Sequence, residues 1–110
     1  MPPISPLVIE AGGGHEFVID TGFNGSLYVP EDIIETWGLP FVSSLLIALA
    51  DQSTIVADVF EATVVWFGAS VRVQVLAGPP GCESLLGMEL LQGCRIEFDQ
   101  LIGEVRVEHL

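Results

Sequence analysis

The sequence predicts an all-β domain that also contains one or two short helices. Short apolar runs, of a length typical of strands, recur along most of the 110 residues. Glycine, proline and small polar residues separate these runs at close spacing, as turns do in β structure. Residues 95–99 and 104–108 alternate strictly between polar and apolar, which predicts a hairpin around Gly103. Many short strands with little helix favour a closed or sandwiched β fold, expected as one domain over residues 1–110.

The first part of the chain predicts a hairpin followed by a tight loop. The proline-rich residues 1–6 are expected to be extended and loose. Residues 11–15 contain three glycines and predict a turn that leaves His15 in solvent. Residues 21–25 interrupt the pattern again with a tight loop. The strands expected on either side of these breaks are residues 7–10, 16–20 and 26–29.

A short helix is predicted over residues 30–37. Proline suits the first helical position, two acidic residues follow in the first turn, and Gly38 suits the C-terminal end. Three apolar side chains would share one helical face: Ile33, Ile34 and Trp37. Trp37 and Trp66 both fall on apolar faces, where core packing is the more common role.

The centre of the chain predicts a β-hairpin over residues 44–58. Its tip is polar, at Asp51, Gln52 and Ser53, and is expected in solvent. The remaining elements expected are strands over residues 59–67 and 70–76, a loop over 78–81 and a second short helix over 85–91.

The charge of the chain excludes some classes of partner. The formal net charge is −12, there is no lysine, and the cations are Arg72, Arg95 and Arg106. Nucleic acids and anionic membrane surfaces require a basic face, so neither is an expected partner. The acidity most simply serves solubility; the alternatives are an acidic working pH or cationic substrates. Half of the residues are hydrophobic, which favours burial against a partner, and a second copy is the simplest partner.

The cysteines and the start of the chain predict an intracellular protein. Cys82 and Cys94 are too few for a disulfide scaffold, so free thiols are expected, with a bridge between them left open. The start lacks a signal-peptide pattern, and no apolar stretch approaches the roughly 20 residues that span a membrane, so a cytoplasmic location is expected. No metal site or cofactor is expected, because His15 and His109 are far apart and neither cysteine neighbours a histidine.

Catalytic chemistry is indicated by the segment from Phe17 to Gly22. An apolar strand here leads into Asp20, which begins a tight turn with Thr21 and Gly22. Alone this tripeptide is a weak signal, because an aspartate often caps its own turn. A second segment, two leucines and a glycine at residues 85–87, lies much later in the chain, and the predicted central hairpin lies between the two.

In this order and spacing, the three segments resemble the retroviral-type aspartic proteases and their prokaryotic single-domain relatives. The resemblance covers residues 7–99, most of the chain. The runs Leu-Ala-Asp-x-Ser at residues 49–53 and Leu-Leu-Gly-Met-x-Leu-Leu at 85–91 look more like the prokaryotic members. The resemblance implies a retropepsin-like closed β-barrel half that acts as a homodimer, with a peptide substrate held under two flaps.

The resemblance also implies a role for each residue of the site. Asp20 supplies the catalytic carboxylate, Thr21 ties the two active-site loops together, and Gly22 offers its carbonyl to the substrate. Gly87 permits close packing beneath this loop. Phe23 lines a substrate subsite, or packs in the core on the alternative interpretation. The other substrate contacts implied are Asn24 and a flap tip of Ala50, Asp51, Gln52 and Ser53.

Three features depart from the viral pattern. Asn24 and Met88 stand where the viral enzymes carry an aspartate and a basic residue that pair, and losing both leaves no unpaired charge. Gln52 stands where relatives commonly carry glycine, which bears on the mobility of the flap. The chain also continues beyond residue 98, near which viral chains end, so the dimer is expected to be joined differently.

The chain contains a single Asp-Thr-Gly, so a two-carboxylate mechanism requires two chains. One ionised carboxylate takes a proton from water while the protonated one donates to the carbonyl oxygen. Two carboxylates about 3 Å apart share one proton, and the aspartic peptidase pair is the standard example. We therefore predict an aspartic endopeptidase that uses Asp20 from each chain of a homodimer. The alternatives are a catalytically silent retropepsin-fold module for binding or dimerisation, and an unrelated β domain.

Overall fold

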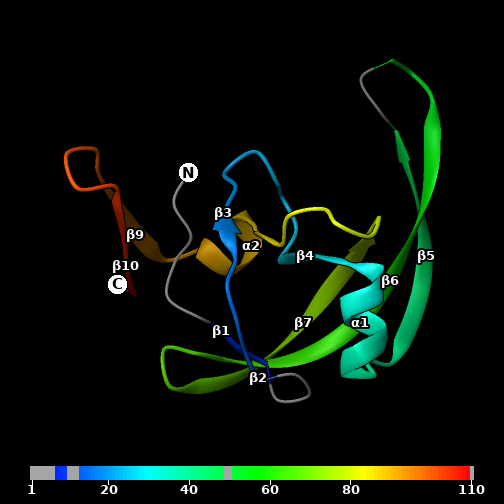
Figure 1. Ribbon diagram of the computed structural model, residues 1–110, viewed down its shortest axis with the longest axis horizontal. Coiled ribbons are helices and arrows are strands. Elements are labelled where there is room, and N and C mark those ends of the chain that lie inside the picture. Colours follow the sequence, from blue (N-terminus) through cyan, green and yellow to red (C-terminus); the bar gives the residue numbers. More distant parts are fainter. Residues whose placement is uncertain (1–6, 10–12, 49–50, 110) are drawn as a thin grey trace.

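The computed structural model describes residues 7–9, 13–48 and 51–109, which are mostly β with two short helices (Figure 1). The prediction of a mainly β fold with one or two short helices is confirmed, whereas residues 1–6 lie outside the described part. The helices are α1 (Glu31–Trp37) and α2 (Met88–Leu91). The strands are β1 (Leu7–Ile9), β2 (Gly13–His15), β3 (Val18–Ile19), β4 (Leu27–Pro30), β5 (Phe41–Ala48), β6 (Thr54–Trp66), β7 (Ala69–Gly78), β8 (Leu85–Leu86), β9 (Cys94–Asp99) and β10 (Glu104–His109).

One eight-stranded sheet runs through the molecule in the order β2-β1-β6-β7-β4-β8-β3, with β5 paired to β6. Its central ladder joins β6 and β7, from Val59 opposite Leu76 to Trp66 opposite Ala69. Strand β4 is parallel to β7, β3 is parallel to β8, and β4 is antiparallel to β8. Strand β8 therefore lies between β3 and β4, although it is far from both in the sequence.

The expected closed barrel is not completed by hydrogen bonds within the described residues. The path of paired strands ends at β2 on one side and at β3 on the other. These two strands are successive parts of residues 13–19: the first part pairs with β1 and the second with β8. The sheet is therefore open. Its two edge strands, β2 and β3, are connected along the chain but are not hydrogen-bonded to each other.

One cluster of buried apolar side chains holds the strands and both helices together. Phe17 and Ile19, which precede Asp20, are 0% and 1% exposed. Burying a side chain of this size stabilises a fold by about 1.5–3 kcal/mol, so this strand is firmly anchored. Trp37 and Trp66 pack against the same cluster, as predicted. The other large side chains that are fully buried are Leu27, Val29, Ile34, Val59, Val64, Val75 and Leu86.

Helix α1 is confirmed, although it begins at Glu31, one residue later than predicted. Pro30 precedes its first turn, and Gly38 ends it in the left-handed conformation, at a φ of 67°. The Gly38 N–H donates to the carbonyls of Ile34 and Glu35, both at 3.0 Å. Glycine adopts this φ without the steric penalty of a Cβ, so the stop signal read from the sequence acts as expected.

Three of the predicted elements are wrong. The hairpin expected between residues 7–10 and 16–20 does not form, because β1 pairs with Gly13–His15, inside the predicted turn, and β3 pairs with β8. Leu85 and Leu86 form strand β8 rather than the first turn of a helix, because the Val18 and Asp20 N–H groups donate to the Ser84 and Leu86 carbonyls at 2.9 and 3.0 Å. Residues 59–67 are not a separate strand, since β6 continues unbroken from the predicted hairpin to its end at Trp66.

His15 was expected in a solvated turn, but it lies in strand β2 and is half-buried. Its Nε2 lies 2.8 Å from the Ser84 Oγ, and its ring centre is 5.0 Å from those of Phe17 and Trp37. Burial lowers the pKa of His15 below its ordinary value, and the charge of Glu16 opposes this shift in part. The ring therefore joins β2, α1 and the segment before β8 in its neutral form.

Acid is expected to weaken this junction. Because the folded pKa of His15 is below the unfolded value of about 6.5, the unfolded chain binds more protons just below that pH. The contribution of neutral His15 is complete above about pH 6.5 and is lost progressively as the pH falls from this value to the lower pKa of the folded state. Urea unfolding at pH 7.5 and pH 5.5 should show a larger loss of stability for the native chain than for His15→Gln. Equal losses in the two proteins would contradict this assignment.

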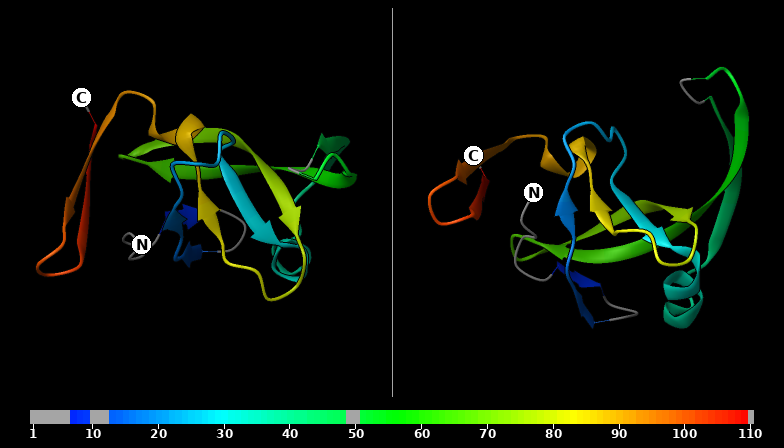
Figure 2. Two further views of the ribbon diagram at one scale, coloured as in Figure 1. Left: turned by 90° about the horizontal axis from the view of Figure 1, so that it is seen from above. Right: turned by 45° about the horizontal axis from the view of Figure 1, so that its top comes forward.

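Two hairpins project from the body of the molecule, as both views show (Figures 1 and 2). The first, called the flap here, comprises residues 41–60 of β5 and β6 and confirms the predicted central hairpin. The second joins β9 to β10 in a sheet of their own, as predicted. Its Ile96, Val105 and Val107 pack against the core, while Leu101 at its turn is 97% exposed. No helix in the described ranges is long and apolar enough to cross a membrane.

Candidate active site

The backbone of Asp20 is fixed to the neighbouring strand. Asp20 follows β3 directly, and its N–H donates to the Leu86 carbonyl at 3.0 Å. Its own carbonyl accepts from the Phe23 N–H at 3.1 Å, which closes the tight turn expected from the sequence. The side chain is half-exposed, so the carboxylate stands at the surface on a rigidly held backbone.

A backbone amide orients the Asp20 carboxylate. The Gly22 N–H donates to Oδ1 at 2.9 Å. A Cβ added to Gly22 would lie 3.2 Å from the same oxygen, closer than most real contacts. Thr21 and Gly22 are both exposed at the rim of this turn. The turn thus holds one carboxylate oxygen in place, and a larger residue than glycine would crowd it.

Gly87 lies directly beneath the Asp20 loop. A Cβ at this position would be 2.2 Å from the Gly25 carbonyl oxygen and 2.7 Å from that of Phe23. The backbone there bonds the loop from below, since Gly87 donates to the Ser26 carbonyl at 2.9 Å and Met88 to that of Phe23 at 2.8 Å. These contacts bind the two segments singled out in the sequence into one unit.

Phe23 is half-buried and packs within its own loop. Its ring meets Tyr28 edge-on, with centres 6.2 Å apart, and lies where a Cβ on Gly25 or Gly87 would be. The Phe23 ring therefore helps to pack the loop, and only its exposed part is accessible to a substrate. Asn24, beside it, is exposed.

The flap tip carries a small hydrogen-bonded turn. Asp51 Oδ1 accepts from the Ser53 N–H at 3.0 Å and from the Ser53 hydroxyl at 2.5 Å. These bonds lower the pKa of Asp51. Gln52 between them has a φ of 69°, a left-handed conformation that favours glycine. This is the position at which relatives commonly have glycine, and Ala50 lies outside the described residues.

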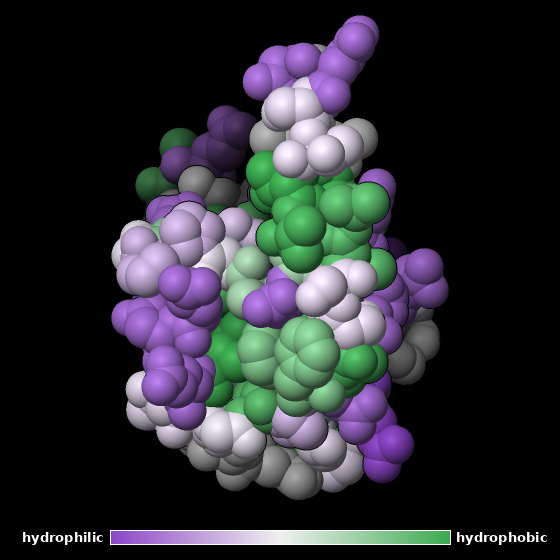
Figure 3. All heavy atoms as spheres, turned by 90° about the vertical axis from the view of Figure 1, so that its right-hand side faces the viewer, coloured by the Kyte–Doolittle hydropathy of each residue, from purple (hydrophilic) through white to green (hydrophobic). Residues whose placement is uncertain are grey.

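The flap and the Asp20 loop rise from the same side of the molecule (Figures 1 and 2). Apolar side chains gather on the flap below its hydrophilic tip (Figure 3). The exposed apolar side chains of the flap include Leu46 and Val56, which are opposite each other in the ladder of β5 and β6 and are 76% and 66% exposed. Leu45 and Ile55, each 47% exposed, belong to the other face of the hairpin. An exposed apolar surface of this kind is typical of a binding face.

Gly25 and Ser26 belong to the site but were not singled out in the sequence. The Gly25 carbonyl accepts from the Glu89 N–H at 3.2 Å, and the Ser26 side chain is buried. Their contribution is through backbone carbonyls, which any residue has. Of the two, only Gly25 could have been singled out in the sequence, because the site requires a glycine there: a Cβ would lie 2.7 Å from the Phe23 ring.

The two cysteines are free thiols, as expected. Burial raises the pKa of Cys82 and of Cys94. A raised pKa lowers the fraction of reactive thiolate, so neither residue has the setting of a nucleophile. Across the described ranges, no group of three or more histidine, cysteine or acidic side chains is placed to hold one metal ion.

The chain is similar in structure to solved proteins. The chain superposes on the solution structure of Simian Foamy Virus (mac) protease with a TM-score of 0.60 and 26% sequence identity, over 82% of this chain and 91% of that one. The chain has a retropepsin-like fold. No protein-family model and no curated protein matches the sequence. The likeness to prokaryotic relatives therefore rests on the sequence runs alone and stays a prediction.

Proposed function

We propose that the chain is an aspartic endopeptidase. The observation that carries the proposal is the Asp-Thr-Gly turn itself, held against Leu86 and Gly87 with a half-exposed carboxylate on a retropepsin-like fold. The same residues in a surface turn of another fold would be an ordinary capping motif.

The proposed mechanism uses two Asp20 carboxylates, one from each chain of a homodimer. One takes a proton from a bound water, and the other, protonated, donates to the carbonyl oxygen of the scissile peptide. Repulsion between two adjacent carboxylates keeps one of them protonated. The Gly22 N–H keeps each carboxylate oriented while the proton moves. No covalent intermediate is required.

The other residues are assigned to support this step. Thr21 links the two loops across the dimer axis, and Gly22 offers its carbonyl to the substrate backbone. Gly87 lets the loop lie close to α2. The flap tip, with Asp51, Gln52, Ser53 and Ala50, closes over the substrate and excludes water. Asn24 and the exposed part of Phe23 line the substrate channel.

A second copy of the chain is the proposed partner. The isolated chain exposes apolar side chains on its flap and on the turn of the C-terminal hairpin, where Ile102 is 67% exposed. Association would remove such surface from water, at about 25 cal/mol per Å². The free thiols agree with a cytoplasmic location, which we include in the proposal.

The alternative is a catalytically silent module with the same fold. The observation that favours it is Gln52, a non-glycine residue in a left-handed conformation at the flap tip. A left-handed conformation at a non-glycine residue costs about 1 kcal/mol, and it restricts the backbone conformations that the flap tip can adopt. A peptidase requires the flap to open for each substrate, whereas a binding module does not.

Peptide digestion separates the two functions. A pool of synthetic peptides incubated with the native chain from pH 3 to pH 9 should be cleaved at acidic pH, and cleavage should fall at high pH once both carboxylates ionise. The same samples should sediment at about twice the monomer mass at micromolar concentration. A cleavage rate that climbs steadily to pH 9 would indicate other chemistry. No cleavage by a folded dimer would favour the silent module.

A further inference from the structure

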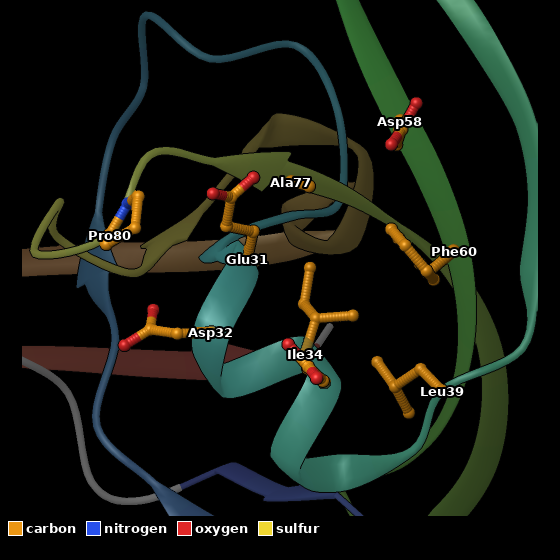
Figure 4. Close-up of a pocket in the computed structure, with 9 residues that line it drawn as sticks. Glu31, Asp32, Ile34, Leu39, Asp58, Phe60, Ala77 and Pro80 are labelled. Carbon is orange, nitrogen blue, oxygen red and sulfur yellow. The ribbon is translucent and has the colours of Figure 1, made fainter.

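A groove outside the Asp20 loop combines an apolar floor with a ring of carboxylates. It lies between helix α1, the base of the flap and the end of β7, with a cavity volume of about 480 Å³. This is within the usual range for ligand sites, about 300–1,000 Å³. Figure 4 shows Ile34, Leu39 and Phe60 together at its centre, with Ala77 beside them. Ile34 and Leu39 belong to the core, so the floor is rigid.

The polar part of the lining is entirely acidic. Asp32, Glu31 and Glu35 come from α1, and Asp58 comes from β6 across the groove. All four side chains are exposed. Asp58 is held in place by the Ser44 hydroxyl, which donates to its Oδ1 at 2.9 Å. The lining residues thus present up to four negative charges around an apolar surface, with no basic side chain among them.

The chain itself supplies little to neutralise this ring. It contains no lysine, and Arg72 pairs with Glu61 at 3.4 Å. Arg95 and Arg106 lie on the C-terminal hairpin, on the opposite side of the molecule from α1 (Figures 1 and 2). Glu31 and Glu35 are four residues apart on one helix, a spacing at which like charges repel and weaken the helix. A cation from another molecule would relieve this repulsion.

We propose that this groove binds a lysine or arginine side chain of a peptide segment from another molecule. The aliphatic stem of such a side chain packs on apolar surface while its charged end reaches carboxylates, which matches the floor and the rim. The carboxylates are spread around the groove, and no three acidic groups in the described residues are placed for one metal ion. This arrangement favours an extended organic cation. The site is separate from the Asp20 loop, of which it uses no residue, although Asp58 and Phe60 belong to the base of the flap.

Chemical-shift titration of the ¹⁵N-labelled chain tests the proposal. The probe is the acetylated, amidated tripeptide Lys-Leu-Lys, and the protein is Asp20→Asn so that the probe stays intact. We expect shifts confined to α1, the flap base and the end of β7. The variant Glu31→Gln with Glu35→Gln should weaken binding about three- to tenfold, as loss of two exposed ion pairs implies. Its matched control, Glu97→Gln with Glu108→Gln, removes the same charge from the C-terminal hairpin and should bind as tightly as the parent.

Two further probes make the test decisive. The same tripeptide with norleucine in place of lysine keeps the stem without the charge, and it should not bind. Spermidine carries charge without an apolar side chain, and it should bind more weakly than the tripeptide. The proposal is overturned if both double variants weaken binding equally, since this would indicate general attraction to an acidic protein. Spermidine binding as tight as the tripeptide, or shifts only around the Asp20 loop, would overturn it as well.

Discussion

Replacing Asp20 by asparagine is expected to reduce peptide hydrolysis by about 10²- to 10⁴-fold. Asparagine is nearly the same size and its side-chain oxygen can still accept from the Gly22 N–H, so the loop should keep its shape. It can neither take a proton from water nor donate an acidic one, and positioned proton transfer contributes about 10²- to 10⁴-fold to a rate. Cleavage of the peptide pool, read by mass spectrometry, measures the loss.

The matched control is Asp99→Asn. It makes the same change of charge in the turn of the C-terminal hairpin, where the aspartate accepts from the Leu101 N–H and asparagine can do so too. This variant should cleave at nearly the native rate. Equal cleavage by native protein and Asp20→Asn would mean that the activity belongs to a contaminant or to another site.

Gly87→Ala is expected to destabilise the fold by about 3 kcal/mol and to remove peptidase activity with it. The new methyl group would lie 2.2 Å from the Gly25 carbonyl oxygen and 2.5 Å from the Phe23 ring. Neither neighbour can move without disturbing the Asp20 loop, and overpacking of this kind costs about 1–3 kcal/mol or more. The melting temperature should therefore fall by about 13 °C. Urea and thermal unfolding of the purified protein measure both quantities.

Gly103→Ala is the control for this substitution. Gly103 has a φ of 67° in the last hairpin turn, and a Cβ there would meet nothing within 4 Å. Its cost should be limited to backbone strain of about 1 kcal/mol, with activity retained. If Gly87→Ala proved no more destabilising than Gly103→Ala, the close packing beneath the Asp20 loop would not be essential.

The parts of the fold with local signals could be predicted from the sequence. Helix α1 is bounded by Pro30 and Gly38, whose preferences act without help from distant residues. The last hairpin followed from strict alternation around Gly103. In contrast, Leu85 and Leu86 have no local preference that separates strand from helix. They form a strand because β3 lies beside them, and that pairing is between residues distant in sequence.

The residues of the candidate site likewise fall into those that could be predicted from the sequence and those that depend on contacts distant in the chain. Asp20 and Gly87 could be singled out because Asp-Thr-Gly and the later Leu-Leu-Gly, in this order and spacing, resemble the retroviral-type proteases. His15 was misplaced, because its burial depends on Trp37 and Ser84, which reach it from other parts of the chain. The acidic groove was not foreseen at all, since its walls come from α1 and from Asp58 of the flap.

Subunit mixing tests most directly whether the active site is shared between two chains. Native protein is equilibrated with a ninefold excess of Asp20→Asn chains, and cleavage is measured with substrate in excess of both. If each site requires Asp20 from two chains, about nine in ten native chains would have an inactive partner, so activity per native chain should fall about tenfold. An unchanged activity per native chain, in a mixture shown to have exchanged subunits, would mean that one chain holds a complete site and would contradict the shared pair of aspartates.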